Sequence, residues 1–138
     1  MSVTFLKRNW FQRLLGIPAT AKPGDPGCWR FDDGVLTLDL EQAPELHEPG
    51  GAIRLEGKKL PVRVLILRGQ EGTYHAFRNR CTHIGHRRLD PVPGTDTVQC
   101  CSVGKSTYDL EGRNIFGPAS KPLQAYRVAV AGNTLIVR

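Results

Sequence analysis

The sequence predicts an all-β fold, a sandwich or a small barrel, preceded by one short helix. Short apolar and β-branched runs recur along the chain, and turn residues separate them. Fifteen glycines and ten prolines in 138 residues predict frequent tight turns. No helical pattern alternates with these runs, which argues against repeated strand–helix units. The expected strands are residues 34–40, 62–67, 74–79, 97–101, 123–130 and 134–137.

The size and composition of the chain indicate one folded domain. Hydrophobic residues make up 40% of it and charged residues 23%, as in ordinary globular proteins. We divide it into an N-terminal helix with a Pro/Gly-rich linker, residues 1–33, and a β domain, residues 34–138. The net charge of +6 is not gathered in one block, and no aromatic-interleaved basic motif is present. Nucleic acid is therefore not an expected partner.

The cysteine content and the N-terminal sequence indicate a cytoplasmic protein. Four cysteines are too few and too irregularly spaced for a secreted disulfide scaffold. The N-terminus lacks the pattern of a signal peptide, because charged residues interrupt its apolar ones. No apolar run is long enough for a transmembrane segment.

A short helix is expected at residues 5–15, where apolar residues follow a helical spacing. Leu6, Trp10 and Leu14 lie four residues apart, and Gly16 ends the pattern. We expect this amphipathic helix to bury its apolar stripe against the domain or to dock a partner or a subunit. The alternative is that the helix lies on an anionic membrane surface.

The residues most informative about function are cysteines and histidines. The sequence Cys-Thr-His at residues 81–83 follows a predicted strand, and Cys100 and Cys101 end a later one. A two-iron, two-sulfur centre with mixed ligands takes two thiolates on one iron and two imidazoles on the other. The first Cys-x-His pair is complete here, whereas the second lacks its histidine, because His86 is the last histidine of the chain.

This arrangement resembles the Rieske iron–sulfur family, whose signature is a Cys-x-His loop followed by a Cys-x-x-His-Gly-Ser-x-Phe/Tyr-Asp loop. The resemblance covers residues 34–138 and implies Rieske-like stacked antiparallel sheets with two cluster-binding loops. It also implies a [2Fe–2S] cofactor and a ferredoxin-like role in electron transfer. The downstream residues that agree with the family are Ser106, Tyr108, Asp109, Gly117, Pro118, Ala119, Pro122, Leu123, Tyr126 and Val128.

The second loop departs from the family pattern in either of two alignments. Aligning Tyr108 and Asp109 without gaps places the second cysteine on Cys101 and the histidine position on Gly104. Shifting to Cys100 places Val103 at the histidine position and requires an inserted residue. We prefer the Cys101 alignment. The cysteine pair of high-potential respiratory members is also missing, so this chain is more similar to the soluble ferredoxins and oxygenase-type members.

The residues leave three states of the site open. In the first state a cluster is bound by Cys81, His83 and Cys101, with His86 as the candidate fourth ligand. Cys100 is the alternative, although neighbouring strand residues point to opposite faces. The second state is a single zinc or iron ion on two thiolates and two imidazoles. The third state holds no metal, with Cys81 and Cys101 reduced or joined in a disulfide.

Three residues near the second loop are expected to influence such a site without binding metal. Lys105 and the Ser106 hydroxyl are placed to donate hydrogen bonds toward an anionic sulfur site. The resemblance implies the same role for Ser106 and Tyr108. Donors near the sulfurs stabilise the reduced state and raise the reduction potential.

The leading functional interpretation is a small electron carrier, or an electron-transfer component of an oxidoreductase complex, that works with a redox protein partner. Oxygenase members of the family add a catalytic domain with a mononuclear iron, for which 138 residues leave no room. We therefore expect no catalytic residues and no enzyme activity of the chain alone. The alternatives are a cluster-free interaction or structural subunit, and a thiol sensor that uses Cys100 and Cys101.

Overall fold

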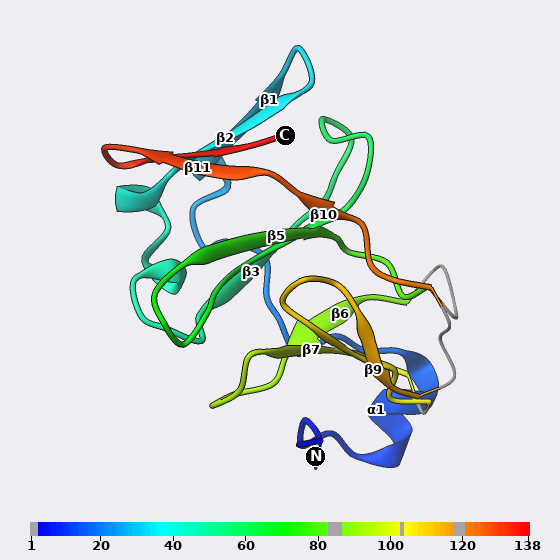
Figure 1. Cartoon of the computed structure of the whole chain (residues 1–138). Coiled ribbons are helices and arrows are strands. Elements are labelled where there is room, and N and C mark those ends of the chain that lie inside the picture. The colour runs from blue at the N-terminus through cyan, green and yellow to red at the C-terminus, as the bar shows by residue number, and fades with distance from the viewer. Residues whose placement is uncertain (1–2, 83–86, 103, 118–120) are drawn as a thin grey trace.

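Three antiparallel sheets stacked on one another form the fold (Figure 1). The computed structural model describes residues 3–82, 87–102, 104–117 and 121–138. Each sheet has four strands in the described part of the chain, and the helical content there is one short α-helix and three single turns. The prediction of an all-β fold with stacked antiparallel sheets and a short N-terminal helix is confirmed.

The strand order within each sheet separates the chain into spatial layers. The first sheet has the order β1 (Trp29–Asp32), β2 (Val35–Asp39), β12 (Thr134–Val137), β11 (Val128–Ala131). The second has the order β10 (Ala125–Tyr126), β5 (Tyr74–Arg78), β4 (Val64–Arg68), β3 (Ala52–Leu55). The third has the order β6 (Leu89–Pro91), β7 (Thr97–Cys100), β8 (Thr107–Asp109), β9 (Asn114–Phe116). Helix α1 spans Trp10–Leu15, and the 3-10 turns are η1 (Pro26–Cys28), η2 (Leu40–Gln42) and η3 (Pro44–Leu46).

Strand β4 holds the layers together because both of its faces are apolar. Val64 and Ile66 lie in a core shared with β2 and β12 of the first sheet. Leu65 and Leu67 lie in a second core shared with the third sheet. Since successive strand residues point to opposite faces, a continuous apolar run is what a middle layer requires.

Strand β1 begins before the predicted β domain. It pairs with β2 through a two-residue turn at Asp33 and Gly34, whose φ angles of 51° and 79° are both left-handed. Asp-Gly is a favoured pair for such a hairpin turn, because both positions need positive φ. The boundary predicted at residue 34 therefore falls inside a hairpin, and the first sheet includes residues 29–32.

Helix α1 is shorter than predicted, and it turns its apolar face to the surface instead of toward the domain. It covers six residues, with an Asn9–Gln12 capping box at its start and the left-handed Gly16 (φ 65°) at its end. Its one buried residue is Arg13, whereas Trp10 and Phe11 are 69% and 61% exposed. The expectation that the apolar stripe packs on the domain is therefore wrong. No helix among the described residues is long and apolar enough to cross a bilayer.

Buried hydrogen bonds explain the orientation of α1. The Arg13 guanidinium donates to the carbonyl oxygens of Leu6 (2.7 Å) and Ser102 (3.3 Å) and to Gln99 Oε1 (2.9 Å). Gln99 Oε1 also accepts from the Leu6 N–H at 3.2 Å. These bonds turn the charged side chain inward, so the apolar side chains at the other positions of the helix face outward.

The stretch after the helix is also fixed to the third sheet. Asp90 of β6 is fully buried, and its two carboxylate oxygens accept the backbone N–H groups of Ala19 and Thr20, both at 2.8 Å. Residues 3–20, called the N-terminal segment below, are thus part of the folded unit.

Replacing Arg13 with alanine is expected to reduce the free energy of unfolding by about 2–3 kcal/mol, because it leaves buried acceptors without a donor. Urea unfolding followed by circular dichroism measures the change. Arg30→Ala is the matched control, since Arg30 lies exposed on β1. An equal, small effect of the two substitutions would show that the N-terminal segment contributes little to stability.

Candidate metal centre

Two loops meet where the second and third sheets face each other. The first follows β5 and leads into β6, and the second joins β7 to β8. Cys81 N–H donates to Arg87 O at 2.9 Å and closes the base of the first loop, and Cys101 N–H donates to Arg88 O at 3.0 Å and joins the second loop to the first. This pairing brings residues from sequence-distant loops together.

Cys81 and Cys100 lie together at the base of these loops. Both side chains are buried, at 0% and 1% exposure, in the core that also holds Tyr108. Their side chains are hydrogen-bonded, and this contact with Cys81, followed by burial, raises the pKa of the Cys100 thiol. Cys100 Sγ also lies 3.2 Å from Ser102 Oγ. The protein thus holds two thiols in contact in a nearly water-free environment.

Cys101 faces the opposite side of β7. Its thiol donates to the carbonyl oxygen of Gly16, at 3.3 Å, and burial raises its pKa. The alternation along the strand explains the difference, since Val98 and Cys100 point into the core while Gln99 and Cys101 face the N-terminal segment. The structure therefore brings Cys100, not the preferred Cys101, next to Cys81.

The irregular geometry of the second loop accommodates the residue that the Cys100 alignment adds. Gln99 pairs with Thr107, and Cys100 N–H donates to Ser106 O at 2.7 Å. Lys105 has a left-handed backbone (φ 55°), and the pairing of β8 with β9 shifts by a residue between Thr107 and Tyr108. This irregular backbone favours the alignment that places the second cysteine on Cys100.

Tyr108 connects the first loop to the thiol pair. Its hydroxyl lies 3.7 Å from Cys81 Sγ and 2.9 Å from Thr82 Oγ1, and it accepts from Thr82 N–H at 3.3 Å. Thr82 Oγ1 donates to Lys121 O at 2.7 Å and so accepts from Tyr108. Burial is the main cause that raises the pKa of Tyr108 to about 12. Tyr108 therefore stays neutral, and its single O–H proton is directed to Thr82 Oγ1 beside Cys81.

Ser106 and Lys105, the other two residues predicted to influence the site, do not share the surroundings of Tyr108. Ser106 is buried, and Gly117 (φ 94°) approaches it so closely that an added Cβ would lie 2.6 Å from Ser106 Cα. Lys105 directs its ammonium group over the ring of Phe5, 5.1 Å from the ring centre. Lys105 thus contacts the N-terminal segment.

The surroundings of Cys81 are positively charged. A surface hollow of about 380 Å³ beside it is lined by Arg78, Arg80 and Lys121, with Thr82, Pro122 and Gln124, and no carboxylate is among these described lining residues. Positive charge next to a buried sulfur group lowers the energy of an anionic state. The site is therefore electrostatically suited to an anionic group.

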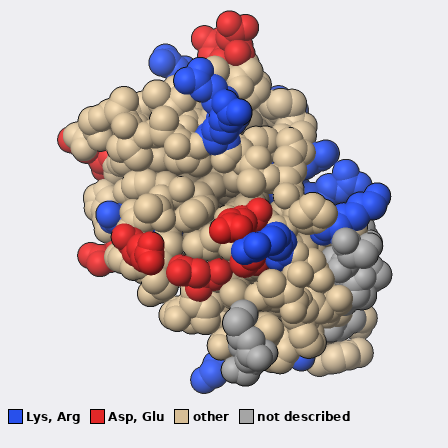
Figure 2. All heavy atoms as spheres, viewed as in Figure 1, with Lys and Arg blue, Asp and Glu red and all other residues tan. Residues whose placement is uncertain are grey.

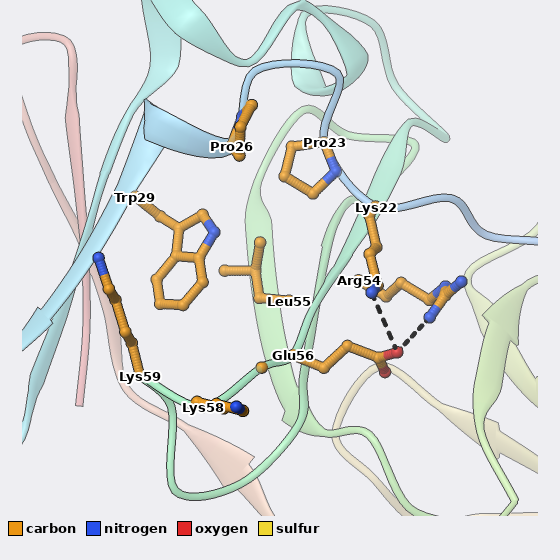
Figure 3. Close-up of a pocket in the computed structure, with 10 residues that line it drawn as sticks. Lys22, Pro23, Pro26, Trp29, Arg54, Leu55, Glu56, Lys58 and Lys59 are labelled. Carbon is orange, nitrogen blue, oxygen red and sulfur yellow. Dashed lines mark hydrogen bonds and ion pairs between the residues drawn. The ribbon is translucent and has the colours of Figure 1, made fainter.

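A network of ion pairs supports the base of the first loop from the other side. Glu56 accepts from Arg88 Nε at 2.8 Å and Nη2 at 3.1 Å, and it also pairs with Arg54 and, at 3.9 Å, with Lys22. Burial alone would raise the pKa of Glu56, but the bonds and charges of Arg88 and Arg54 lower it. Figure 3 shows Glu56 reaching toward Lys22 and Arg54 at the edge of a hollow whose wall is Trp29 and Leu55.

The imidazole side of the candidate centre lies outside the described residues. His83 and His86, and Val103 at one of the aligned histidine positions, belong to that part of the chain. Among the described residues, no group of three or more metal-binding side chains comes together. The donor chemistry thus fits the thiolate half of a cluster, and His83 and His86 are the histidines that the loop sequence supplies for the other half.

Comparison with known proteins assigns the family. The model of the Rieske [2Fe–2S] domain matches residues 39–127. The chain therefore belongs to the Rieske [2Fe–2S] domain family, as the motifs predicted, and members of this family normally bind a [2Fe–2S] cluster used in electron transfer.

Relatives with known activities are much longer than this chain. Over 72 residues it is 38% identical to the glycine betaine monooxygenase oxygenase subunit of Pseudomonas aeruginosa (strain UCBPP-PA14), covering 52% of this chain and 16% of that subunit. The corresponding subunit of Chromohalobacter salexigens is 38% identical over 53 residues, covering 38% of this chain and 12% of that subunit. The chain thus spans less than a fifth of these relatives.

Solved structures show the same fold. The ferredoxin of carbazole 1,9a-dioxygenase from Nocardioides aromaticivorans IC177 matches with a TM-score of 0.55 and 21% identity, over 73% of this chain and 92% of that chain. The cyanobacterial plasma membrane Rieske protein PetC3 from Synechocystis PCC 6803 matches with a TM-score of 0.51 and 24% identity, over 62% and 85% of the two chains. The quaternary ammonium Rieske monooxygenase CntA, in complex with γ-butyrobetaine, matches with a TM-score of 0.52 and 20% identity, over 68% of this chain and 29% of that chain.

Sequence reasoning missed the polar contacts that organise this region. Asp90 and Gln99 are buried and bind the N-terminal segment, yet neither was singled out. One available signal was the alternation from Val98 to Cys101, in which Val98 and Cys100 form the more apolar face. That pattern favours Cys100 as the inward cysteine.

Substituting Tyr108 with phenylalanine is expected to lower the unfolding free energy of the metal-free protein by about 1–2 kcal/mol, because Thr82 loses hydrogen-bond partners. The fold raises the pKa of Tyr108 from 10 to about 12 and so favours the neutral hydroxyl. The stability that the neutral Tyr108 hydroxyl contributes is complete below pH 10 and is lost as the pH rises through about 12. The stability difference between wild type and variant should therefore shrink between these pH values, measured by urea unfolding.

Tyr74→Phe is the control for loss of a hydroxyl at a half-buried position. A difference between wild type and Tyr108→Phe that stays constant from pH 10 to 12 would contradict the assigned environment of the Tyr108 hydroxyl.

Proposed function

We propose that this chain is a Rieske-type electron-transfer protein whose cluster is held by Cys81 and Cys100 on one iron and by His83 and His86 on the other. The buried contact between Cys81 and Cys100 is the observation that carries the proposal. Cys101 is left out of the ligand set because its thiol donates to Gly16 O on the other side of β7. The first loop then supplies both imidazoles, which replaces the histidine missing from the second loop.

The chain's own groups prepare the site for an anionic sulfur centre. When bound, a [2Fe–2S] cluster supplies one-electron redox chemistry. Once the thiols are deprotonated, the Ser102 hydroxyl donates to Cys100 Sγ, and the Tyr108 O–H turns from Thr82 Oγ1 to donate to Cys81 Sγ. Arg78, Arg80 and Lys121 add positive charge nearby, which favours the more negative reduced state. Each of these effects raises the reduction potential.

In this proposal the chain passes electrons to or from a redox protein partner and performs no chemistry on a substrate itself. Its relatives include oxygenase subunits, and its fold is shared with a ferredoxin of a dioxygenase system. Four buried cysteine thiols suit a reducing compartment such as the cytoplasm.

A cluster-free interaction module is the second candidate function. Two observations favour it: the sequence has no histidine after His86, and the N-terminal segment binds Ser102 and Cys101 of the second loop. In that case the Cys81 and Cys100 thiols serve as buried core groups.

Replacing Cys81 or Cys100 with serine is expected to abolish the visible absorption of the anaerobically purified protein and to remove its iron and acid-labile sulfide, because each provides a thiolate ligand. Cys101→Ser is the matched control and should retain at least about half of the iron and sulfide. Loss of the cluster in Cys101→Ser but not in Cys100→Ser would exclude the proposed ligand set. A wild-type protein without iron and sulfide would support the cluster-free candidate.

Replacing His86 with alanine tests the imidazole side. We expect loss of the cluster signal, since His86 and His83 together replace the ligand that the second loop does not provide. His47→Ala is the control, because His47 is exposed and its Nε2 contacts Leu40 O. An unchanged absorption spectrum and iron content in His86→Ala would remove His86 from the ligand set.

A further inference from the structure

Large apolar side chains are concentrated at one end of the molecule. Seven of the eight exposed large hydrophobic residues among those described lie there, and the eighth is Val130 on β11. They form what we call the N-terminal apolar surface, which consists of Phe5, Trp10, Phe11, Leu14, Leu15, Ile17 and Phe116. Phe5 and Phe116 contact edge to face, with ring centres 5.0 Å apart, so β9 is continuous with the N-terminal segment. Such clustering exceeds the scattered exposure that a protein surface normally has.

The protein fixes these side chains in an outward orientation. Arg13 occupies the inner face of α1 through its bonds to Leu6, Gln99 and Ser102. Arg87 Nη2 donates to Leu14 O at 3.2 Å, and the Arg87 side chain fills the space where a Cβ on Gly16 would lie. The apolar face is thus held outward by specific polar contacts on the opposite face, at a cost in exposed apolar area.

The charged side chains that the described part of the chain brings against this surface are basic. Residues 1–24 contain no aspartate or glutamate, whereas Lys7 is exposed and Arg8 donates to Ile17 O at 3.0 Å. Lys105 lies over the Phe5 ring and Arg87 contacts Leu14. In Figure 2 the lower end of the molecule, where Figure 1 places α1 and the N-terminus, presents no Asp or Glu atoms on the face in view.

We propose that the N-terminal apolar surface binds the headgroup region of an anionic lipid bilayer. Trp10, Phe11 and Leu15 would enter the interface between headgroups and acyl chains, while Lys7 and its basic neighbours would contact lipid phosphates. A bilayer offers a uniform negative surface, which matches exposed apolar side chains with basic residues beside them. Figure 1 places the short helix that carries most of these side chains at one end of the molecule. A second copy of the chain is a poorer occupant, because the same positive charges would face each other.

This assignment does not require a bound cluster, although Arg87, Ser102 and Lys105, which contact the N-terminal segment, belong to the two loops of the candidate centre. It places the protein on a membrane surface through side chains that enter the interface, and no helix among the described residues spans a bilayer. Its failure would leave the proposed electron-transfer function unaffected, and loss of the cluster would leave membrane binding in place.

The test is co-sedimentation of the full chain with vesicles of phosphatidylcholine alone and of phosphatidylcholine mixed with phosphatidylglycerol. We expect binding to the mixed vesicles at about 0.1 M salt, at least about tenfold tighter than to the neutral ones, and weaker binding at about 0.5 M salt. In a Trp29→Phe background, Trp10 is the remaining tryptophan, and its fluorescence should shift to shorter wavelength on the mixed vesicles.

The triple variant Trp10→Ser, Phe11→Ser, Leu15→Ser is expected to bind at least about tenfold more weakly, because it removes three apolar insertions. Lys7→Glu should also weaken binding. The matched controls are Val130→Ser, which changes the other exposed large hydrophobic residue, and Lys59→Glu, which changes an exposed lysine of a different surface. Circular dichroism of each variant confirms that it is folded.

Four results would overturn the proposal. The first is absence of wild-type binding to mixed vesicles, and the second is equal binding by wild type and the triple variant. The third is self-association of the wild-type chain, measured by light scattering, that the triple variant abolishes, which would assign the surface to a second copy. Vesicle-free binding of an acidic redox protein through Trp10, with no lipid binding, would assign it to a protein partner.

Discussion

The alternation of side chains along β7 determines how both functional regions of this protein are built. Val98 and Cys100 point toward the second sheet, and Gln99 and Cys101 point toward the N-terminal segment. A shift of one residue would exchange these two sets. The contact between Cys81 and Cys100 and the anchoring of α1 therefore depend on one register, which the pairing of β7 with β6 and β8 fixes.

The N-terminal segment covers one face of the third sheet through polar contacts. Asp90 accepts backbone N–H groups of the segment, and Gln99 and Ser102 accept hydrogen bonds from Arg13. The Cys101 thiol donates to Gly16 O. Each contact pairs a buried polar group of the sheet with a group of the segment, and buried polar groups without partners are costly. The segment and the sheet are thus one structural unit, although the family resemblance begins after the segment.

The sequence predicted the elements with strong local signals and missed those that depend on tertiary contacts. Strand β12 was placed at its observed bounds, because Thr134–Val137 follows a clear turn and is rich in β-branched and aliphatic residues. Strands β6 and β9 have three residues each, too few for a pattern to be visible. The helix was assigned by its apolar spacing, but buried acceptors on Gln99 and Ser102 take up Arg13 and invert its orientation. The family of the candidate site followed from the spacing of Cys81, His83 and Cys101. The inward cysteine did not, because the extra loop residue beside the left-handed Lys105 is invisible in an alignment without gaps.

The buried carboxylate of Asp90 has a practical consequence for producing this protein in the laboratory. A shortened version that keeps only the family-matched residues 39–127 would lack Ala19 and Thr20, and it would also lose β1, β11, β12 and most of β2. Asp90 and Gln99 would then lose their partners in the N-terminal segment, and the face of the third sheet that this segment covers would be uncovered. Attempts to express the minimal motif in isolation should therefore yield insoluble material, whereas a chain retaining residues 3–138 keeps each of these interior groups satisfied.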